Sequence, residues 1–191
     1  MDKKLKIAIA VIAVIIIAII AALFLIGNSE KTLQGTGAKV TLPSDYEIDY
    51  TKGIATKDDK IILFNGIIGN TSLTTDFYKA ISENGKEAGY EDISEDTINN
   101  FKVYKYSAKP SNLKTVSYGS LMQWVEYPPV ELVDSTGQKI EADHYKKIYY
   151  ISPNNSTANE LTIIAKKPDT DLNTDEITKI INSISLNENQ N

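Results

Sequence analysis

Oxygen-bearing side chains recur at alternate positions in the segment Asp169-Thr170-Asp171-Leu172-Asn173-Thr174-Asp175-Glu176. A calcium-binding EF-hand loop takes ligands at such spacing, but it also needs a glycine at its sixth position and a bidentate glutamate at its twelfth. Thr174 and Ile180 stand at those two places. The alternative is a helix start, in which Asn173 and Glu176 resemble a capping box and acidic residues favour the first turn. We predict capping and no metal site, with weak calcium binding by Asp169, Asp171, Asn173 and Asp175 as the alternative.

The one histidine of the chain, His144, has Glu141, Asp143 and Tyr145 as neighbours. An imidazole beside carboxylates can bind a metal or move a proton. In a strand, however, Asp143 and Tyr145 point to the face opposite His144, which gives poor ligand geometry. No serine stands in a Gly-x-Ser-x-Gly setting, and the chain has no cysteine nucleophile. We therefore predict a solvated strand residue, no catalytic residues and no enzyme.

Aromatic residues gather in the middle of the chain, where Tyr118, Trp124 and Tyr127 precede Pro128-Pro129. Such a cluster can line a groove for a carbohydrate or a peptide. Aromatic residues at strand spacing more often belong to the core or to the face of a sheet. Tyr118 and Trp124 share a strand face only if the segment between them is unbroken. These three aromatic residues are the candidate binding residues.

Three asparagines, Asn70, Asn154 and Asn155, begin the N-glycosylation pattern Asn-x-Ser/Thr. All three lie in predicted turns, which is the context that glycosylation needs. Whether any of them is modified depends on the host, so occupancy stays open.

The composition excludes several kinds of function. The chain carries a formal net charge of −5, and residues 30–191 hold 17 lysines and 24 acidic residues, a net charge of −7. Nucleic acid is a poor partner for such an acidic surface. No arginine occurs, so bidentate recognition of phosphate is absent. No cysteine occurs either, which leaves a hydrophobic core to stabilise the domain without disulfides.

A charge-free apolar run from Ile7 to Ile26 has the length that an α-helix needs to cross a bilayer. Lys3, Lys4 and Lys6 precede it, and the positive-inside rule then places the N-terminus in the cytoplasm. We predict a single-pass signal anchor that holds the following domain outside the cell membrane. A cleaved signal peptide is the alternative, although its apolar region is usually only about 7–15 residues long.

Hydrophobic spacing in the rest of the chain predicts strands joined mostly by short turns. Strands are expected at 39–42, 54–56, 61–68, 101–106, 115–125, 148–151 and 161–165. The charged turn at 57–60 and the polar turn at 153–156 each favour a hairpin. Helices are expected from about Leu73 and from Thr174, where isoleucines recur at helical spacing.

A set of short motifs accompanies these elements between Lys39 and Leu186. Leu42-Pro43 is followed by Tyr46, Gly89-Tyr90 precedes a strand, and the last helix carries Asn182-Ser183-Ile184. This order resembles the PsbP-like family, which is typified by an extrinsic photosystem subunit. The resemblance implies an antiparallel sheet between helices and a non-enzymatic role in protein binding or assembly. It carries over no photosystem-specific residue.

Together these patterns predict an α+β protein, in which an N-terminal transmembrane helix precedes one domain with an antiparallel sheet packed by helices. The expected boundaries are 1–27 for the cytoplasmic stub and anchor, 28–37 for a tether, 38–187 for the extracytoplasmic domain and 188–191 for a polar tail. The expected function is a membrane-anchored, non-enzymatic binding or assembly domain with a protein or envelope partner. A tethered domain that binds a carbohydrate or a small hydrophobic ligand is the alternative. No cofactor is predicted.

Overall fold

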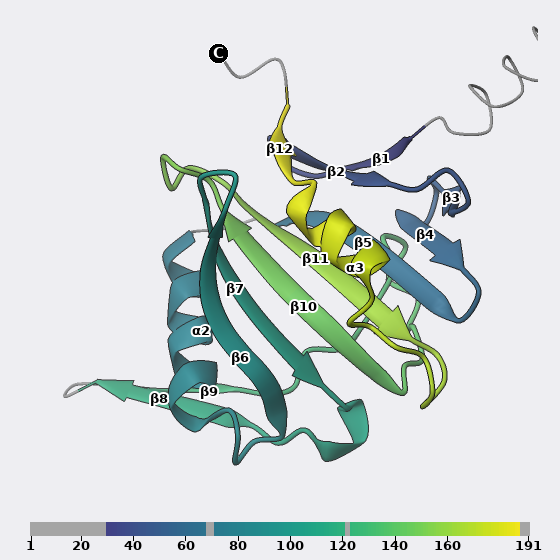
Figure 1. Ribbon diagram of the computed structural model, residues 1–191. Helices are drawn as coiled ribbons and strands as arrows, with labels where there is room; N and C mark the ends of the chain where they lie inside the picture. Colours follow the sequence, from purple (N-terminus) through teal and green to yellow (C-terminus); the bar gives the residue numbers. More distant parts are fainter. Residues whose placement is uncertain (1–29, 68–70, 121–122, 188–191) are drawn as a thin grey trace, which may run out of the picture.

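The protein is seen as a computed structural model that describes residues 30–67, 71–120 and 123–187 (Figure 1). Its elements follow one another as β1 (Lys31–Gln34), β2 (Ala38–Leu42), β3 (Glu47–Asp49), β4 (Ile54–Lys57), β5 (Lys60–Ile67), α2 (Thr71–Asn84), β6 (Tyr90–Ile98), β7 (Phe101–Ala108), the 3-10 turn η1 (Pro110–Asn112), β8 (Val116–Ser120), β9 (Gln123–Tyr127), β10 (His144–Ile151), β11 (Ala158–Ala165), α3 (Asp175–Asn182) and β12 (Ser185–Leu186).

The centre of the molecule is a seven-stranded antiparallel sheet with the strand order β3-β4-β5-β11-β10-β7-β6. Sequence-adjacent strands form its hairpins. Lys57 pairs with Lys60 across a two-residue turn, in which Asp58 adopts a positive φ of 52°. β10 and β11 pair along their whole length, so both predicted hairpins are confirmed. β1, β2 and β12 form a separate three-stranded sheet, and β8 pairs with β9.

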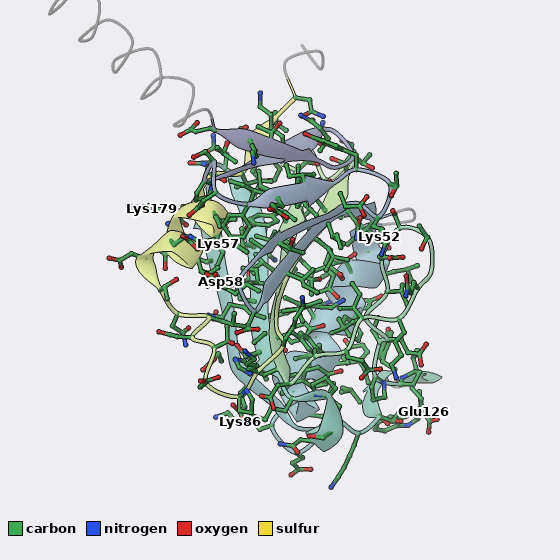
Figure 2. All side chains as sticks on the ribbon, turned by 90° about the vertical axis from the view of Figure 1, so that its right-hand side faces the viewer. Lys52, Lys57, Asp58, Lys86, Glu126 and Lys179 are labelled. Atoms are coloured by element: carbon green, nitrogen blue, oxygen red, sulfur yellow. The ribbon has the colours of Figure 1, made fainter. Side chains whose placement is uncertain are left out.

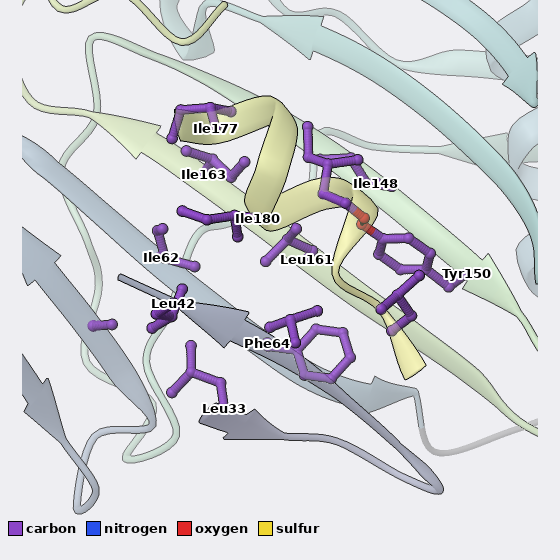
Figure 3. Close-up of a cluster of buried hydrophobic side chains, with 14 of the residues drawn as sticks. Leu33, Leu42, Ile62, Phe64, Ile148, Tyr150, Leu161, Ile163, Ile177 and Ile180 are labelled. Atoms are coloured by element: carbon purple, nitrogen blue, oxygen red, sulfur yellow. The ribbon is translucent and has the colours of Figure 1, made fainter. Parts of the chain in front are cut away.

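The long central strands bury both of their faces, which is why they read as continuous apolar runs. In β5, Ile62 and Phe64 face one core, while Ile61 and Leu63 face a second core on the opposite side. The first core lies under α3 and the small sheet, as Figure 3 shows for Ile177 and its neighbours. The second core lies under α2 and the β8–β9 hairpin (Figure 1). The sheet therefore separates two cores.

Helix α3 begins where Thr174 caps it, because the Thr174 hydroxyl oxygen accepts a hydrogen bond from the Ile177 amide at 3.3 Å. Glu176, which was expected to share in the cap, instead accepts hydrogen bonds from Tyr46 and from Lys57. Lys57 reaches α3 from β4, as Figure 2 shows. The tyrosine hydroxyl of Tyr150 donates to the Ile181 carbonyl at 2.9 Å. These contacts fix α3 on the first face of the sheet.

The predicted α+β class is wrong, because the described part of the chain is mostly β-sheet. The sequence pattern missed several strands. β1 lies inside the segment expected to be a tether, and β6 is an edge strand whose middle is polar and exposed. The predicted strand at 115–125 is in fact the two strands β8 and β9. Strands with few buried residues lack the apolar alternation on which the prediction depended.

The prediction of an N-terminal transmembrane helix finds no support in the described part of the chain. Within residues 30–67, 71–120 and 123–187, no helix has the length and apolarity to cross a membrane. The run from Ile7 to Ile26, and with it the predicted signal anchor, lies outside the described residues, as does the tail at 188–191.

Candidate functional site

An apolar cleft of about 420 Å³ opens on the second face of the sheet, beside α2. Separate parts of the chain meet there: the end of β5, the first half of α2, the segment that follows β9, and the strands β10 and β11. The lining residues are Ile67, Leu73, Thr74, Phe77, Tyr127, Pro128, Pro129, Val130, Tyr149 and Glu160. We call this space the apolar cleft.

Helix α2 and the end of β9 form the aromatic wall of the cleft. The ring of Phe77 meets the ring of Tyr127 edge-on, with centroids 5.3 Å apart, and it meets Tyr149 in the same way at 6.3 Å. Thr74, one turn before Phe77 on α2, is buried. These contacts tie the helix to two strands and hold the wall in place.

The lips of the cleft are apolar and open to solvent. Leu73 on α2 is 63% exposed and Val130 is 46% exposed. Val130 follows Pro128-Pro129, whose rings restrict the backbone and remove two amide donors from this edge. Leu132 is buried and anchors the segment behind them. Large apolar side chains that stay exposed beside a cleft are typical of a binding site.

Glu160 lies at the floor of the cleft and forms an ion pair with the buried Lys147. The Lys147 ammonium donates to Glu160 Oε1 at 2.7 Å, and the Thr162 hydroxyl donates to the same oxygen at 2.9 Å. The Lys147 side chain is only 3% exposed, and that of Glu160 is 20% exposed. Strand register explains the group, since Tyr149 stands opposite Glu160 and Lys147 opposite Thr162.

The surroundings of Glu160 keep it ionised. Burial alone raises the pKa of Glu160, but the charge of Lys147 and hydrogen bonds from Lys147, Tyr149 and Thr162 outweigh it and hold that pKa below its usual value. Burial also raises the pKa of Tyr149 well above its usual value, so its phenol stays protonated and can donate. The cleft floor thus presents a carboxylate inside mostly apolar walls.

A second, smaller cavity of about 180 Å³ adjoins the cleft, and Val130 and Glu160 line both. Its other lining residues are Leu63, Asn65, Glu131, Leu132, Val133, Lys147 and Thr162. Compared with the cleft it is richer in polar groups. The two cavities therefore form an apolar space and a polar space on either side of Val130.

The structure places one of the three predicted aromatic residues in the cleft, namely Tyr127. Tyr118 packs against the core beneath the β8–β9 hairpin. Trp124 pairs with Gly119 on the opposite face of the hairpin and is 76% exposed. A Cβ at Gly119 would lie 2.6 Å from the indole ring, so Trp124 covers the glycine. Tyr118 and Trp124 lie on two separate antiparallel strands, and the register of these strands puts the two side chains on opposite faces.

His144 is held between two acceptors. Its Nδ1 lies 2.9 Å from Asp143 Oδ2, and its Nε2 lies 3.0 Å from the carbonyl oxygen of Thr170. Asp143 precedes β10, so strand alternation does not turn it away from His144. The imidazole links β10 to the segment that precedes α3, so its contacts are structural.

The side chains predicted for the calcium alternative do not gather into a metal site. Asp171 Oδ1 accepts from the Asn173 amide at 2.7 Å, and Asn173 Oδ1 accepts from Lys146 at 2.6 Å. Asp169 is exposed, and Asp175 lies in the first turn of α3. Among the residues that the structure describes, no group of three or more His, Asp or Glu side chains could hold a metal ion.

Of the predicted glycosylation acceptors, Asn154 and Asn155 lie in the exposed turn between β10 and β11. Asn154 Oδ1 accepts hydrogen bonds from Ser152 and Ser156, and Asn155 has a positive φ of 55°. Asn70 lies outside the described residues.

Leu73, Val130 and Glu160 line the cleft but were not predicted from the sequence, and neither was Lys147, the partner of Glu160. Leu73 was predicted as the approximate start of a helix, and nothing in the spacing marks it as exposed. Lys147 gave a weak signal, because it is a lysine at a buried position of β10, next to the half-buried Lys146. Its partner Glu160 becomes visible only through the strand register.

Comparisons with known proteins do not identify the chain. No family model matches it, and no curated protein matches it either. A crystal structure from Bacteroides thetaiotaomicron covers 85% of this chain with 10% sequence identity and a TM-score of 0.43, and this chain spans 50% of that one. A likeness of this size carries no argument about fold or function. The resemblance to the PsbP-like family stays a prediction.

Proposed function

We propose that this protein is a non-enzymatic binding domain and that the apolar cleft beside α2 takes a small amphiphilic molecule. The observation that carries the proposal is the cleft itself, whose apolar walls enclose a few convergent polar groups at Glu160 and Tyr149. Its volume of about 420 Å³ lies in the range of small-molecule sites, and its composition is typical of them. The polar groups at the floor of the cleft give such a ligand a place for its head group.

A protein partner is the second candidate, as the sequence first suggested. The exposure of Leu73 and Val130 at the lips favours it, because a flat partner surface could cover both side chains at once. A partner of this kind would bury the lips without filling the floor near Glu160.

The proposal is tested with Nile red, an uncharged probe whose emission rises in apolar surroundings. The wild-type domain is expected to bind the dye, and the variant Leu73→Ser/Val130→Ser is expected to bind it about tenfold more weakly, because each substitution removes apolar contact area. Both residues are exposed, so the variant is expected to fold.

Trp124→Ser is the matched control, because it removes an exposed apolar side chain outside the cleft. It should leave dye affinity unchanged. If the wild type does not bind Nile red, or if Trp124→Ser weakens binding more than the double variant does, the cleft is not the site.

A further inference from the structure

We infer that the amphiphile taken by the apolar cleft carries a cationic head, such as a protonated primary amine, and that Glu160 receives this head. The inference rests on the proposed function, and it names the ligand class for the same site. It follows from which charges face the cleft and which are turned away from it.

Glu160 and Lys147 form a pair, but they do not face the same space. Glu160 lines both the cleft and the smaller cavity, whereas Lys147 lines the smaller cavity alone. The ammonium of Lys147, which is absent from the lining of the cleft, donates to Glu160 Oε1. A ligand that enters along the apolar walls therefore meets the carboxylate before the ammonium.

The Glu160 carboxylate can accept a further hydrogen bond. Its donors in the protein are Lys147, Thr162 and Tyr149. A carboxylate offers about four acceptor positions, so three donors leave room for a ligand N–H. The side chain is 20% exposed, which leaves part of it accessible from the cleft. A charge-assisted hydrogen bond to an ammonium head would satisfy the remaining position.

Other acidic residues stand near the same opening. Together with burial, the negative charge of Asp76 on α2 raises the pKa of Tyr127, and Asp76 Oδ1 itself lies 4.0 Å from Lys79 Nζ. Glu131 follows Val130 and lines the smaller cavity. None of the described residues that line the apolar cleft is a lysine. Residues 30–191 carry a net charge of −7, so the wider field has the same sign.

An anionic head would be disfavoured in this position. It would lie in the cleft beside the ionised Glu160, whereas Lys147 lines only the smaller cavity, and like charges at short distance in a partly buried site repel strongly. An uncharged head avoids the repulsion but gains no ion pair. The expected order of affinity is therefore cationic, then neutral, then anionic.

Three probes with the same ten-carbon chain test this order: decylamine, 1-decanol and decanoate. Each is used at neutral pH below the concentration at which it aggregates, and its affinity is read from the displacement of bound Nile red. Decylamine is expected to bind about fivefold or more tightly than decanol, and decanoate about fivefold or more weakly.

Two variants at one exposed position isolate the charge. Leu73→Lys and Leu73→Glu both remove the leucine from the cleft lip, but they add opposite charges there. The ratio of decylamine to decanoate affinity should fall in Leu73→Lys and rise in Leu73→Glu. Glu160→Gln should remove most of the preference, and the two Leu73 variants keep the test valid if Glu160→Gln does not fold.

The outcomes separate the inference from the proposed function. If Nile red binds in the cleft and the three probes displace it equally, or decanoate binds best, the cationic head is wrong and the cleft remains a binding site. If Nile red does not bind at all, the proposed function fails and this inference fails with it.

Discussion

At the scale of single residues, the ion pair of Lys147 and Glu160 should contribute to stability, because the Lys147 ammonium is buried. Replacing Glu160 by Gln leaves the buried Lys147 ammonium without its counterion, which should lower the free energy of unfolding by about 3 kcal/mol. The double variant Glu160→Leu/Lys147→Met should lose less, because it removes both charges together. Urea denaturation measures the differences.

Glu126→Gln serves as the control for that substitution, because Glu126 is an exposed glutamate on β9 (Figure 2). It should change stability by less than about 0.5 kcal/mol. If Glu160→Gln is no more damaging than Glu126→Gln, the pair at the cleft floor contributes nothing to stability.

The pH dependence of the same residue has a defined sign. The folded protein holds the pKa of Glu160 below its usual value of 4.5, so the stabilisation is present above that value and is lost as the pH falls through the lower, folded pKa. The stability difference between wild type and Glu160→Gln should be constant from neutral pH to about pH 6 and should shrink below about pH 4. Denaturation curves across this pH range measure the difference. If it grew on acidification, the folded protein would not hold the pKa of Glu160 below its usual value.

At the scale of elements, Ser183 connects the end of α3 to β2. Its hydroxyl accepts from the Thr41 amide at 2.8 Å and lies 2.7 Å from the Ile180 carbonyl, to which it donates. Ser183→Ala leaves the Thr41 amide without this partner and should cost about 1–2 kcal/mol in thermal or urea unfolding. Asn182→Ala, at the exposed neighbouring position, should cost much less. Equal losses would show that the Ser183 hydroxyl does not hold α3.

The elements that the sequence predicted correctly carry strong local signals. The β4–β5 and β10–β11 hairpins have turn residues between apolar runs, and α3 has isoleucines at helical spacing. β1 and β6 were not predicted because they are edge strands, and a polar edge strand lacks the apolar alternation by which strands are recognised in a sequence. The fold class was wrong for this reason, since the missing strands shift the balance towards sheet.

At the scale of the whole molecule, the sheet separates the core under α3 and the small sheet from the face on which the proposed binding cleft opens. Gly66 on β5 packs closely against the β1–β2 turn, because a Cβ at this position would lie 1.7 Å from Thr36 Oγ1. Gly66→Ala should therefore destabilise the protein by about 1–3 kcal/mol through overpacking. Nile red affinity of the folded fraction should stay at the wild-type value, and a loss of affinity would show that the two sides are coupled.

Only part of the candidate site could be predicted from the sequence. Tyr127 was found from its place among aromatic residues before Pro128-Pro129, and it does line the cleft. Glu160 and Lys147 meet only because β10 and β11 pair in one register, and Leu73 reaches the lip only because α2 crosses beside them. Contacts between distant segments depend on tertiary packing, which local spacing does not encode.

The central claim is that the cleft beside α2 is the binding site. A titration with decylamine, followed by NMR of isotope-labelled methyl groups, tests it most directly. We expect the largest shifts at the methyl groups of Ile67, Leu73 and Val130, with little change at Ile177 and Ile180 in the other core. Shifts concentrated in that other core, or no shifts at concentrations that displace Nile red, would contradict the account.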